Sequence, residues 1–268
     1  ELTRTLQRTR GRDGTPECRG LIQPERKTRI VVLAGVNEPA HSQLAFLNYF
    51  QHPLLSSEVE WSVVFDDVAT SIDIVDADIL TLNRVRSANG VRLLTEARTR
   101  GIASLYFIDD NWFSAAHDIP ALAELFGENS PTMRLFRRAI READAVLTLN
   151  ENLAEDCAAA GARVRLHRPA IDITAHPETT RDPRKPVTLG FLGSTRVSRS
   201  AFVAARRILD EVPGTDVAVF GNDPAHEFDG VAPARLRRHH WVFDYDDYTR
   251  VARGLAVDIL IAPLGSSR

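Results

Sequence analysis

The sequence of 268 residues predicts an α/β protein with two doubly wound parallel sheets, one in each of two domains. Short apolar runs alternate with segments of helical periodicity, which is the pattern of strands connected by helices. The run at residues 29–35 is apolar after Arg29 and ends in glycine, as expected of a parallel strand that is buried on both faces. The chain is also longer than one average domain and is interrupted by a proline-rich stretch.

The first predicted domain begins with that strand, and a helix is expected to follow it over about residues 40–50. Further strands are expected at 61–65, 78–82, 104–108, 145–149 and 163–166, and helices at 87–100, 131–142 and 150–160. Gly161 stands at a plausible C′ position of the last helix.

The composition changes at residues 169–186, where four prolines disfavour regular structure and indicate an interdomain linker. The second domain is predicted to begin with a strand at 187–192, followed by a helix at about 198–210. Strands are then expected at 216–220 and, after His239 and His240, at 241–243. Residues 1–28 are arginine-rich without a sustained apolar period and are interpreted as a linker or arm. The predicted domains are therefore 29–168 and 187–268.

The composition narrows the classes of partner and cofactor. The formal net charge of -3 gives no support to binding of nucleic acid or anionic lipid. Cys18 and Cys157 have neither CxxC nor Cys/His ligand spacing, so neither a disulfide scaffold nor a zinc site is expected. The longest apolar runs fall short of the roughly 20 residues that span a bilayer. No metal, cofactor, nucleic-acid partner or membrane span is expected.

A glycine and two hydroxyls, Gly193, Ser194 and Thr195, stand where a predicted strand passes into a helix. In an open α/β sheet, ligands bind beyond the carboxyl ends of the strands. A helix N-terminus there offers backbone N–H groups to phosphate, and Arg196 and Arg199 could neutralise a diphosphate. An ordinary helix N-cap is the alternative interpretation.

Gly221 and Asn222 follow the next strand of the second domain in the same way. They are predicted to contribute to the same ligand site. An ordinary turn remains the alternative, because glycine and asparagine are common turn formers.

The first domain places Asp109, Asp110, Asn111 and Trp112 directly after its fourth strand. Adjacent carboxylates repel each other, which can raise one pKa and leave a group suited to proton transfer or to orienting a hydroxyl. The two aspartates are the candidate catalytic residues, and Asn111 and Trp112 are candidate acceptor contacts. A capped helix start with exposed aspartates is the alternative.

The loop after the first strand carries Asn37, Glu38 and His41. It lacks GxGxxG, so the dinucleotide-binding fingerprint is absent. These side chains are predicted to contact an acceptor substrate, and structural capping remains an equal alternative.

The order of these motifs resembles the GT-B glycosyltransferases, particularly their family-four-like group. The segments that carry the resemblance are 143–150 (ADAVLTLN), 161–164 (GARV), 168–172 (RPAID), 189–196 (LGFLGSTR), 217–222 (VAVFGN) and 245–262, with Asp258 and Pro263 in register.

This resemblance implies two Rossmann-like domains facing a cleft, and transfer of a sugar from a nucleoside-diphosphate donor to a hydroxyl. The acceptor would be a glycan, a lipid-linked saccharide or a small molecule, with no cofactor beyond the donor substrate. The resemblance favours a retaining, metal-independent enzyme of bacterial surface glycan or polysaccharide synthesis. Such an enzyme would be cytoplasmic or peripheral at the inner membrane face.

Two departures from the family pattern concern the donor site. The lysine common after the glycine turn is absent, and Arg199 is its nearest replacement. The acidic E-x7-E region should follow Pro263, so we expect the second domain to be truncated and completed by residues beyond Arg268. Further domains of the same polypeptide are also expected.

Two other interpretations stay open. Asp76-Ala77-Asp78 and Asp244-Tyr245-Asp246 satisfy the D-x-D pattern of a metal-dependent GT-A transferase. The chain could instead be a non-catalytic module that binds nucleotide sugars or acts as a scaffold in a larger protein.

Overall fold

The computed structural model describes residues 26–35, 42–118, 120–169, 182, 184–193, 199–221, 228–240, 242 and 245–261. It divides into two compact units, unit 1 (Glu1–Ile171) and unit 2 (Asp172–Arg268). The division falls within the proline-rich segment 169–186. Each unit has its own parallel sheet, which confirms the predicted α/β class.

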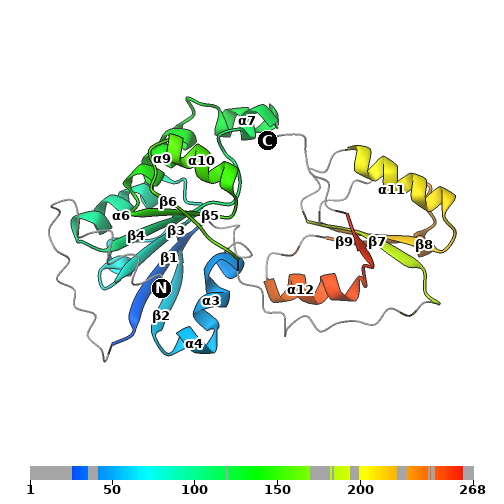
Figure 1. Ribbon diagram of the computed structural model, residues 1–268, viewed down its shortest axis with the longest axis horizontal. Coiled ribbons are helices and arrows are strands. Elements are labelled where there is room, and N and C mark those ends of the chain that lie inside the picture. Colours follow the sequence, from blue (N-terminus) through cyan, green and yellow to red (C-terminus); the bar gives the residue numbers. More distant parts are fainter. Residues whose placement is uncertain are drawn as a thin grey trace. The chain divides into compact units, whose positions relative to one another are not determined.

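Within its described residues, unit 1 contains a six-stranded parallel sheet in the order β2-β1-β3-β4-β5-β6 (Figure 1). The strands are β1 (Thr28–Ala34), β2 (Val59–Phe65), β3 (Ile79–Asn83), β4 (Ala103–Phe107), β5 (Ala145–Thr148) and β6 (Val164–Leu166). Because β2 and β3 lie on opposite sides of β1, the winding of the chain reverses between β1 and β3.

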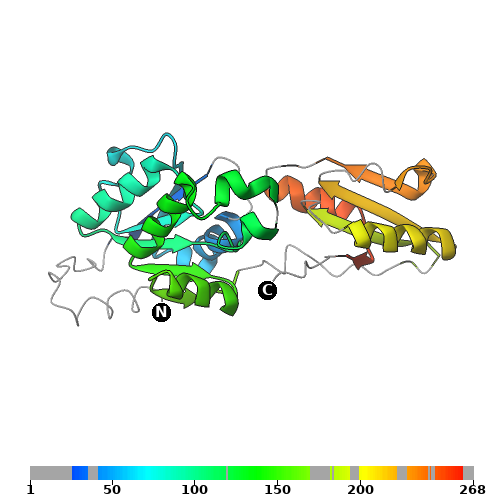
Figure 2. The ribbon, with the colours of Figure 1, turned by 90° about the horizontal axis from the view of Figure 1, so that it is seen from above.

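Helices cover both faces of this sheet (Figures 1 and 2). The described helical segments are η1 (Gln43–Leu47, a π-helical turn), α3 (Asn48–Gln51), α4 (Pro53–Ser56), α5 (Ser71–Ile74), α6 (Ala88–Thr99), α7 (Ala115–Asp118), η2 (Pro120–Leu122, a 3₁₀ turn), α8 (Ala123–Phe126), α9 (Pro131–Glu142) and α10 (Glu151–Ala159). The helices predicted at 87–100, 131–142 and 150–160 are confirmed. The described part of the helix predicted at 40–50 is a π-helical turn, η1, that continues into α3.

Capping residues explain where several of these helices begin and end. The side chains of Ser87, Ser130 and Asn150 each accept a hydrogen bond from a backbone N–H in the first turn of α6, α9 and α10. Gly161 follows α10 with φ of 92°, a left-handed conformation that glycine adopts without a Cβ clash.

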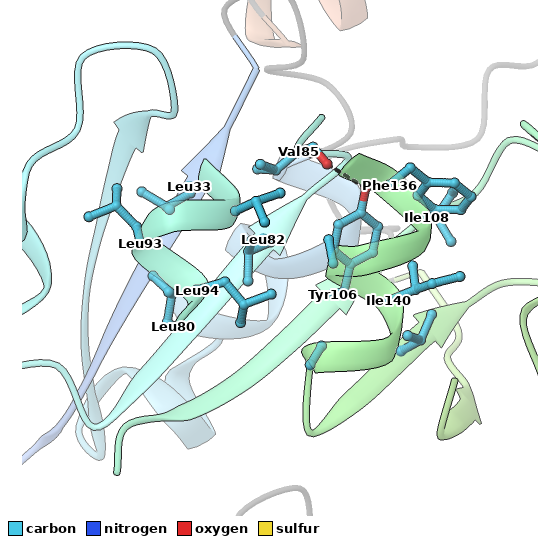
Figure 3. Close-up of a cluster of buried hydrophobic side chains, with 14 of the residues drawn as sticks. Leu33, Leu80, Leu82, Val85, Leu93, Leu94, Tyr106, Ile108, Phe136 and Ile140 are labelled. Carbon is cyan, nitrogen blue, oxygen red and sulfur yellow. Dashed lines mark hydrogen bonds between the residues drawn. The ribbon is translucent and has the colours of Figure 1, made fainter. Parts of the chain in front are cut away.

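Alternating residues of the strands build two separate cores on the two faces of the sheet. On one face Leu33, Leu82 and Tyr106 pack with residues of α6 and α9, as Figure 3 shows. On the other face Val32 and Phe107 belong to the cluster that includes residues of η1 and α3. Burial on both faces explains why the central strands β1, β3, β4 and β5 are largely apolar.

Among the described residues, three aspartates stand directly before a strand and accept a backbone hydrogen bond from a neighbouring strand. Asp78 accepts a hydrogen bond from the backbone N–H of Arg29 (2.8 Å), Asp144 from Ser104 (2.8 Å), and Asp258 from Thr188 (2.8 Å). In each case the donor is the second residue of the neighbouring strand. Asp144 of the ADAV segment and Asp258 of the VDIL segment (residues 257–260) therefore accept backbone hydrogen bonds at the amino edge of a parallel sheet.

Unit 2 contains, in its described residues, a four-stranded parallel sheet in the order β10-β7-β8-β9. Its elements are β7 (Val187–Gly193), α11 (Arg199–Glu211), β8 (Thr215–Gly221), η5 (Pro233–Arg235), β9 (Leu236–His239), α12 (Tyr245–Gly254) and β10 (Ile259–Leu260). Residues of α11 pack on one face of the sheet and residues of α12 on the other (Figures 1 and 2).

Of the strand predicted at 241–243, residues 241 and 243 lie outside the described residues. The structure forms β9 at Leu236–His239, and Val242 lies outside any strand. β9 is an edge strand with β8 as its neighbour, so it does not need the apolar run that identifies a central strand. Because β9 contains Arg237 and Arg238, its hydrophobicity is too low for the sequence pattern to predict a strand there.

None of the helices in the described part of the chain is long and apolar enough to cross a membrane.

Candidate functional site

The carboxyl edge of the unit 1 sheet carries a buried arginine that joins the predicted aspartate pair. Arg84 follows β3, and its side chain is only 9% exposed. Its Nη1 lies 3.3 Å from Oδ1 of Asp109, and its Nη2 lies 2.6 Å from Oδ2 of Asp110. β3 and β4 are adjacent strands, which is why residues 84 and 109–110 meet.

The loop that carries Arg84 is fixed by the core. The Tyr106 hydroxyl donates a hydrogen bond of 2.6 Å to the Val85 carbonyl, drawn as a dashed line in Figure 3. The Arg84 N–H donates to the carbonyl of Phe107 (3.0 Å). A Cβ on Gly90 would lie 2.2 Å from the Val85 side chain, so α6 approaches this loop closely. The buried Tyr106 has a pKa far above its ordinary value because burial disfavours the phenolate.

The aspartate pair differs from the sequence expectation in its electrostatics. The sequence indicates that the adjacent carboxylates of Asp109 and Asp110 repel each other, and the structure adds the Arg84 guanidinium against both of them. The two side chains are also unequal, since Asp109 is 19% exposed and Asp110 is 61% exposed. Sequence reasoning missed Arg84, although its position directly after a buried strand was the same signal that singled out the aspartates.

The two neighbours of the pair have structural partners. Trp112 is 2% exposed and packs against Phe126 and Phe136, with ring centroids 5.2 and 5.0 Å away. Its place in the core argues against the predicted contact with an acceptor. The Asn111 Nδ2 donates to Oδ2 of Asp156 (2.7 Å), which ties the loop after β4 to α10.

Asp66 lies at the same edge, directly after β2, and sequence reasoning did not single it out. Burial raises its pKa, and a hydrogen bond with Ser87 partly opposes the shift. Asp66 is 4% exposed, so its carboxyl group is inside the protein and not on the surface of the site.

Asn83 and His167 hold the start of the η1 and α3 segment. The buried Asn83 donates from Nδ2 to the Ser42 hydroxyl (2.7 Å). His167, after β6, lies 2.9 Å by its Nε2 from the carbonyl oxygen of Ala45. Both contacts bring η1 to the strand ends at which an α/β sheet binds its ligands.

In unit 2 the two predicted donor-site glycines are neighbours. Gly193 ends β7, Gly221 ends β8, and the two residues are paired in the register of the sheet. Gly221 has φ of 119°, a conformation that favours glycine. β7 also lies between β8 and β10, where the winding of this sheet reverses. The carboxyl end of β7 is therefore at a switch point, the usual ligand position of such sheets.

Several predicted site residues lie outside the described residues. These are Asn37, Glu38, His41, Ser194, Thr195, Arg196 and Asn222. Arg199 is the first residue of α11, and its side chain lies outside the described part of the structure.

The first D-x-D segment is on the opposite edge of the unit 1 sheet from Arg84. Asp78 precedes β3 and pairs with Arg26 (2.6 Å), and Asp76 pairs with Arg29 (3.3 Å). These contacts give the segment a structural role at the strand starts. Asp246 of the second D-x-D segment lies in the first turn of α12, and Asp244 is outside the described residues.

Comparison with known proteins gives similarity at the level of structure. No family model matches the sequence, and no curated protein matches it. Sucrose-phosphate synthase from Thermosynechococcus elongatus is similar with a TM-score of 0.58 at 11% identity, covering 90% of this chain and 77% of that one.

Two further solved structures are similar over most of the chain. An α-glucosyltransferase in complex with UDP and a 13-mer DNA has a TM-score of 0.55 at 13% identity, covering 87% of this chain and 70% of that one. A putative UDP-N-acetylglucosamine 2-epimerase from Listeria monocytogenes has a TM-score of 0.53 at 10% identity, covering 90% and 80%. Together with the two parallel sheets, these similarities show that this chain has the GT-B glycosyltransferase fold.

Proposed function

We propose that this protein is a glycosyltransferase that moves a sugar from a nucleoside-diphosphate donor to a hydroxyl acceptor. The observation that carries the proposal is that the carboxyl edge of each parallel sheet bears residues suited to one of the two substrates. Unit 2 presents the paired glycines Gly193 and Gly221, and unit 1 presents the Arg84, Asp109 and Asp110 cluster. The α-glucosyltransferase with the same fold was solved in complex with UDP, which supports a nucleotide-sugar donor.

The unit 2 edge is suited to the diphosphate. Glycines allow a close approach of the backbone, and the thirteen-residue helix α11 begins just beyond β7. The N-terminus of such a helix favours anions through its unpaired N–H groups and its dipole. In the proposed site Ser194, Thr195, Arg196, Arg199 and Asn222 bind the leaving diphosphate and stabilise its growing negative charge.

The unit 1 edge is suited to the acceptor. During transfer the bond between the anomeric carbon and the diphosphate oxygen breaks, and a bond from the acceptor oxygen forms. The acceptor hydroxyl loses its proton. In an inverting reaction an aspartate of the 109–110 pair takes that proton, and in a retaining reaction the leaving phosphate takes it while the aspartates orient the hydroxyl. Asn37, Glu38 and His41 are proposed to complete the acceptor site.

The finer parts of the proposal rest on the sequence resemblance. They are retention, metal independence, the absence of a cofactor, and a cytoplasmic role in bacterial glycan synthesis. The GT-A alternative is less well supported, because Asp76 and Asp78 pair with arginines at the amino edge of the sheet. Donor turnover that persists in EDTA would support metal independence, and strict dependence on Mn²⁺ or Mg²⁺ would contradict it.

Calorimetry with UDP, UDP-glucose and UDP-N-acetylglucosamine tests the donor site directly. We expect binding by the full chain and at least a tenfold weaker affinity in Arg199→Gln. Arg207→Gln is the matched control, because Arg207 is on the same helix and its Nε pairs with Glu211 at 2.6 Å. Absence of binding throughout the panel would contradict the proposal.

The products distinguish transfer from two other activities compatible with the findings. A transferase releases UDP and joins the sugar to the acceptor. An epimerase, the activity attributed to the Listeria protein, would return an isomeric UDP-sugar without any acceptor. A non-catalytic module would bind the nucleotide and leave the sugar unchanged. Mass spectrometry and proton NMR of the products separate the three results.

A further inference from the structure

We propose that Arg84 is a positioning residue that holds Asp110 in one orientation, so that Asp110 receives the hydrogen bond of the acceptor hydroxyl. The inference rests on the proposed transferase function and assigns different tasks to the two aspartates. Asp109 balances the charge of Arg84 within the protein, and Asp110 faces the substrate.

The charges around Arg84 support this division. A guanidinium that is 9% exposed needs a partner charge, because an unpaired buried charge is strongly unfavourable. Asp109, itself 19% exposed, supplies that charge at 3.3 Å. Asp110 then brings a second negative charge to the same cation, leaving the three groups with a net charge of -1.

Exposure decides which carboxylate can meet a substrate. Asp110 leaves 61% of its side chain accessible while its Oδ2 is 2.6 Å from Nη2 of Arg84. The short contact restrains the carboxylate, and the exposure leaves it accessible to a ligand hydroxyl. An exposed aspartate without such a buried anchor would sample several rotamers and lose entropy on binding.

The backbone of Arg84 is strained in a way that the surrounding contacts maintain. Its φ is 55°, in the left-handed region that residues with a Cβ seldom occupy. The bonds from the Arg84 N–H to Phe107 and from Tyr106 to Val85 hold the loop in that conformation. Strain that persists in this way is typical of functional positions, because the geometry it sets is difficult to obtain otherwise.

Arg86 provides a matched control on the same loop. Its guanidinium lies over the rings of Trp112 (5.5 Å) and Phe126 (6.0 Å). Arg86→Gln therefore removes a neighbouring positive charge and a ring contact while the contacts of Arg84 with the aspartates remain.

The first experiment needs no ligand. Three-bond couplings from the Asp110 backbone to its Cγ, measured by NMR on the full chain, report the χ1 rotamer. We expect single-rotamer couplings in the wild type and in Arg86→Gln, and averaged couplings in Arg84→Asn. Asparagine is chosen because it tolerates a positive φ. Averaged couplings in the wild-type protein would overturn the inference, whichever variants fold.

The second experiment uses UDP-glucose as donor and a panel of p-nitrophenyl glycosides as acceptors. Arg84→Asn should lower kcat at least tenfold with the KM for UDP-glucose within twofold, since a small misplacement near the reacting atoms slows the chemical step. Arg84→Lys should recover part of the loss. A rise in the KM for UDP-glucose with unchanged kcat would contradict a positioning role.

A double-mutant cycle identifies the aspartate through which Arg84 acts. In the Asp110→Asn background, Arg84→Asn should change kcat less than twofold, because the group it positions is already gone. An undiminished tenfold loss in that background would overturn the assignment. If wild type transfers no sugar, the proposed function fails, and the coupling measurements still decide whether Arg84 orders Asp110.

Discussion

At the scale of single residues, His167 shows how burial makes the stability of unit 1 depend on pH. Its ring lies 6.4 Å from that of Phe46 and 6.2 Å from that of Phe107. Because the Ala45 carbonyl can only accept, the Nε2 atom 2.9 Å away carries the hydrogen. Burial lowers the pKa of His167, so the folded protein keeps the ring neutral where the unfolded chain is already protonated.

This shift predicts the direction of the pH effect. A lowered histidine pKa means that the unfolded state binds more protons, so the stability contribution is complete above the unfolded pKa of about 6.5. It is lost as the pH falls below that value toward the lower pKa of the folded protein. We expect the urea concentration at the unfolding midpoint of the wild type to be lower at pH 5.5 than at pH 7.5.

His167→Phe should reduce that pH dependence, because phenylalanine keeps the ring packing and does not titrate. His52→Asn is the control, since His52 is exposed and asparagine can keep its N-cap contact with Leu54. If both variants lost the pH dependence equally, burial of His167 would not be the cause of the pH-dependent stability.

Tyr106 gives a second prediction at this scale. Tyr106→Phe leaves the buried Val85 carbonyl without the hydroxyl donor and should lower the free energy of unfolding by about 1–3 kcal/mol. Tyr49→Phe, which removes an exposed hydrogen bond to the Arg168 carbonyl, should cost less. Urea unfolding of both variants makes the comparison, and an equal cost would contradict the importance of burial.

At the scale of elements, the aspartates before β3, β5 and β10 explain part of the family resemblance. Two of the motifs that carry it contain Asp144 and Asp258, and each accepts a hydrogen bond from the backbone N–H of the second residue of an adjacent parallel strand. This requirement belongs to the sheet edge and not to sugar transfer. The motifs are therefore evidence for the fold, and the chemistry has to be argued from the opposite edge.

Asp144→Ala should lower the free energy of unfolding by about 1–3 kcal/mol, because the Ser104 N–H loses its acceptor. Asp144→Asn should cost less, since its amide oxygen can still accept. Denaturant unfolding measures both, and equal losses in the two variants would point to the charge instead of the hydrogen bond. Unchanged stability in Asp144→Ala would contradict the structural role.

At the scale of the whole molecule, the two units have separate hydrophobic cores. Leu82 is fully buried on one face of the unit 1 sheet. In unit 2, Phe191 of β7 is buried against Phe202 of α11. Proposed donor and acceptor groups are thus divided between two independently packed sheets. Each sheet can hold its own strand ends in place.

Separate cores predict separate effects of mutation. Leu82→Ala should lower amide-exchange protection in unit 1, and Phe191→Ala should lower it in unit 2, each by about 2–5 kcal/mol. Hydrogen exchange followed by mass spectrometry assigns the loss to peptides of either unit. An equal loss in both units after either substitution would show that the chain folds as one cooperative body.

Local sequence determined the elements and many candidate positions. Continuous apolar runs located β1, β7 and β8, and helical periodicity located α6, α9 and α10. The glycines and aspartates after strands could be singled out because strand ends are recognisable from periodicity and because their chemistry suits ligands. The polar edge strand β9 could not, since its stability depends on pairing with β8.

The tertiary structure decided how the candidate residues act. Arg84 and Asp110 are 26 positions apart, and they meet because β3 and β4 are neighbours in the sheet. The surrounding core buries the Arg84 guanidinium, and a buried positive charge is stable only beside negative charges such as these carboxylates. The same core encloses Trp112, which therefore packs against other side chains. Neither outcome is contained in local periodicity, because pairing and desolvation depend on which distant segments the fold brings together.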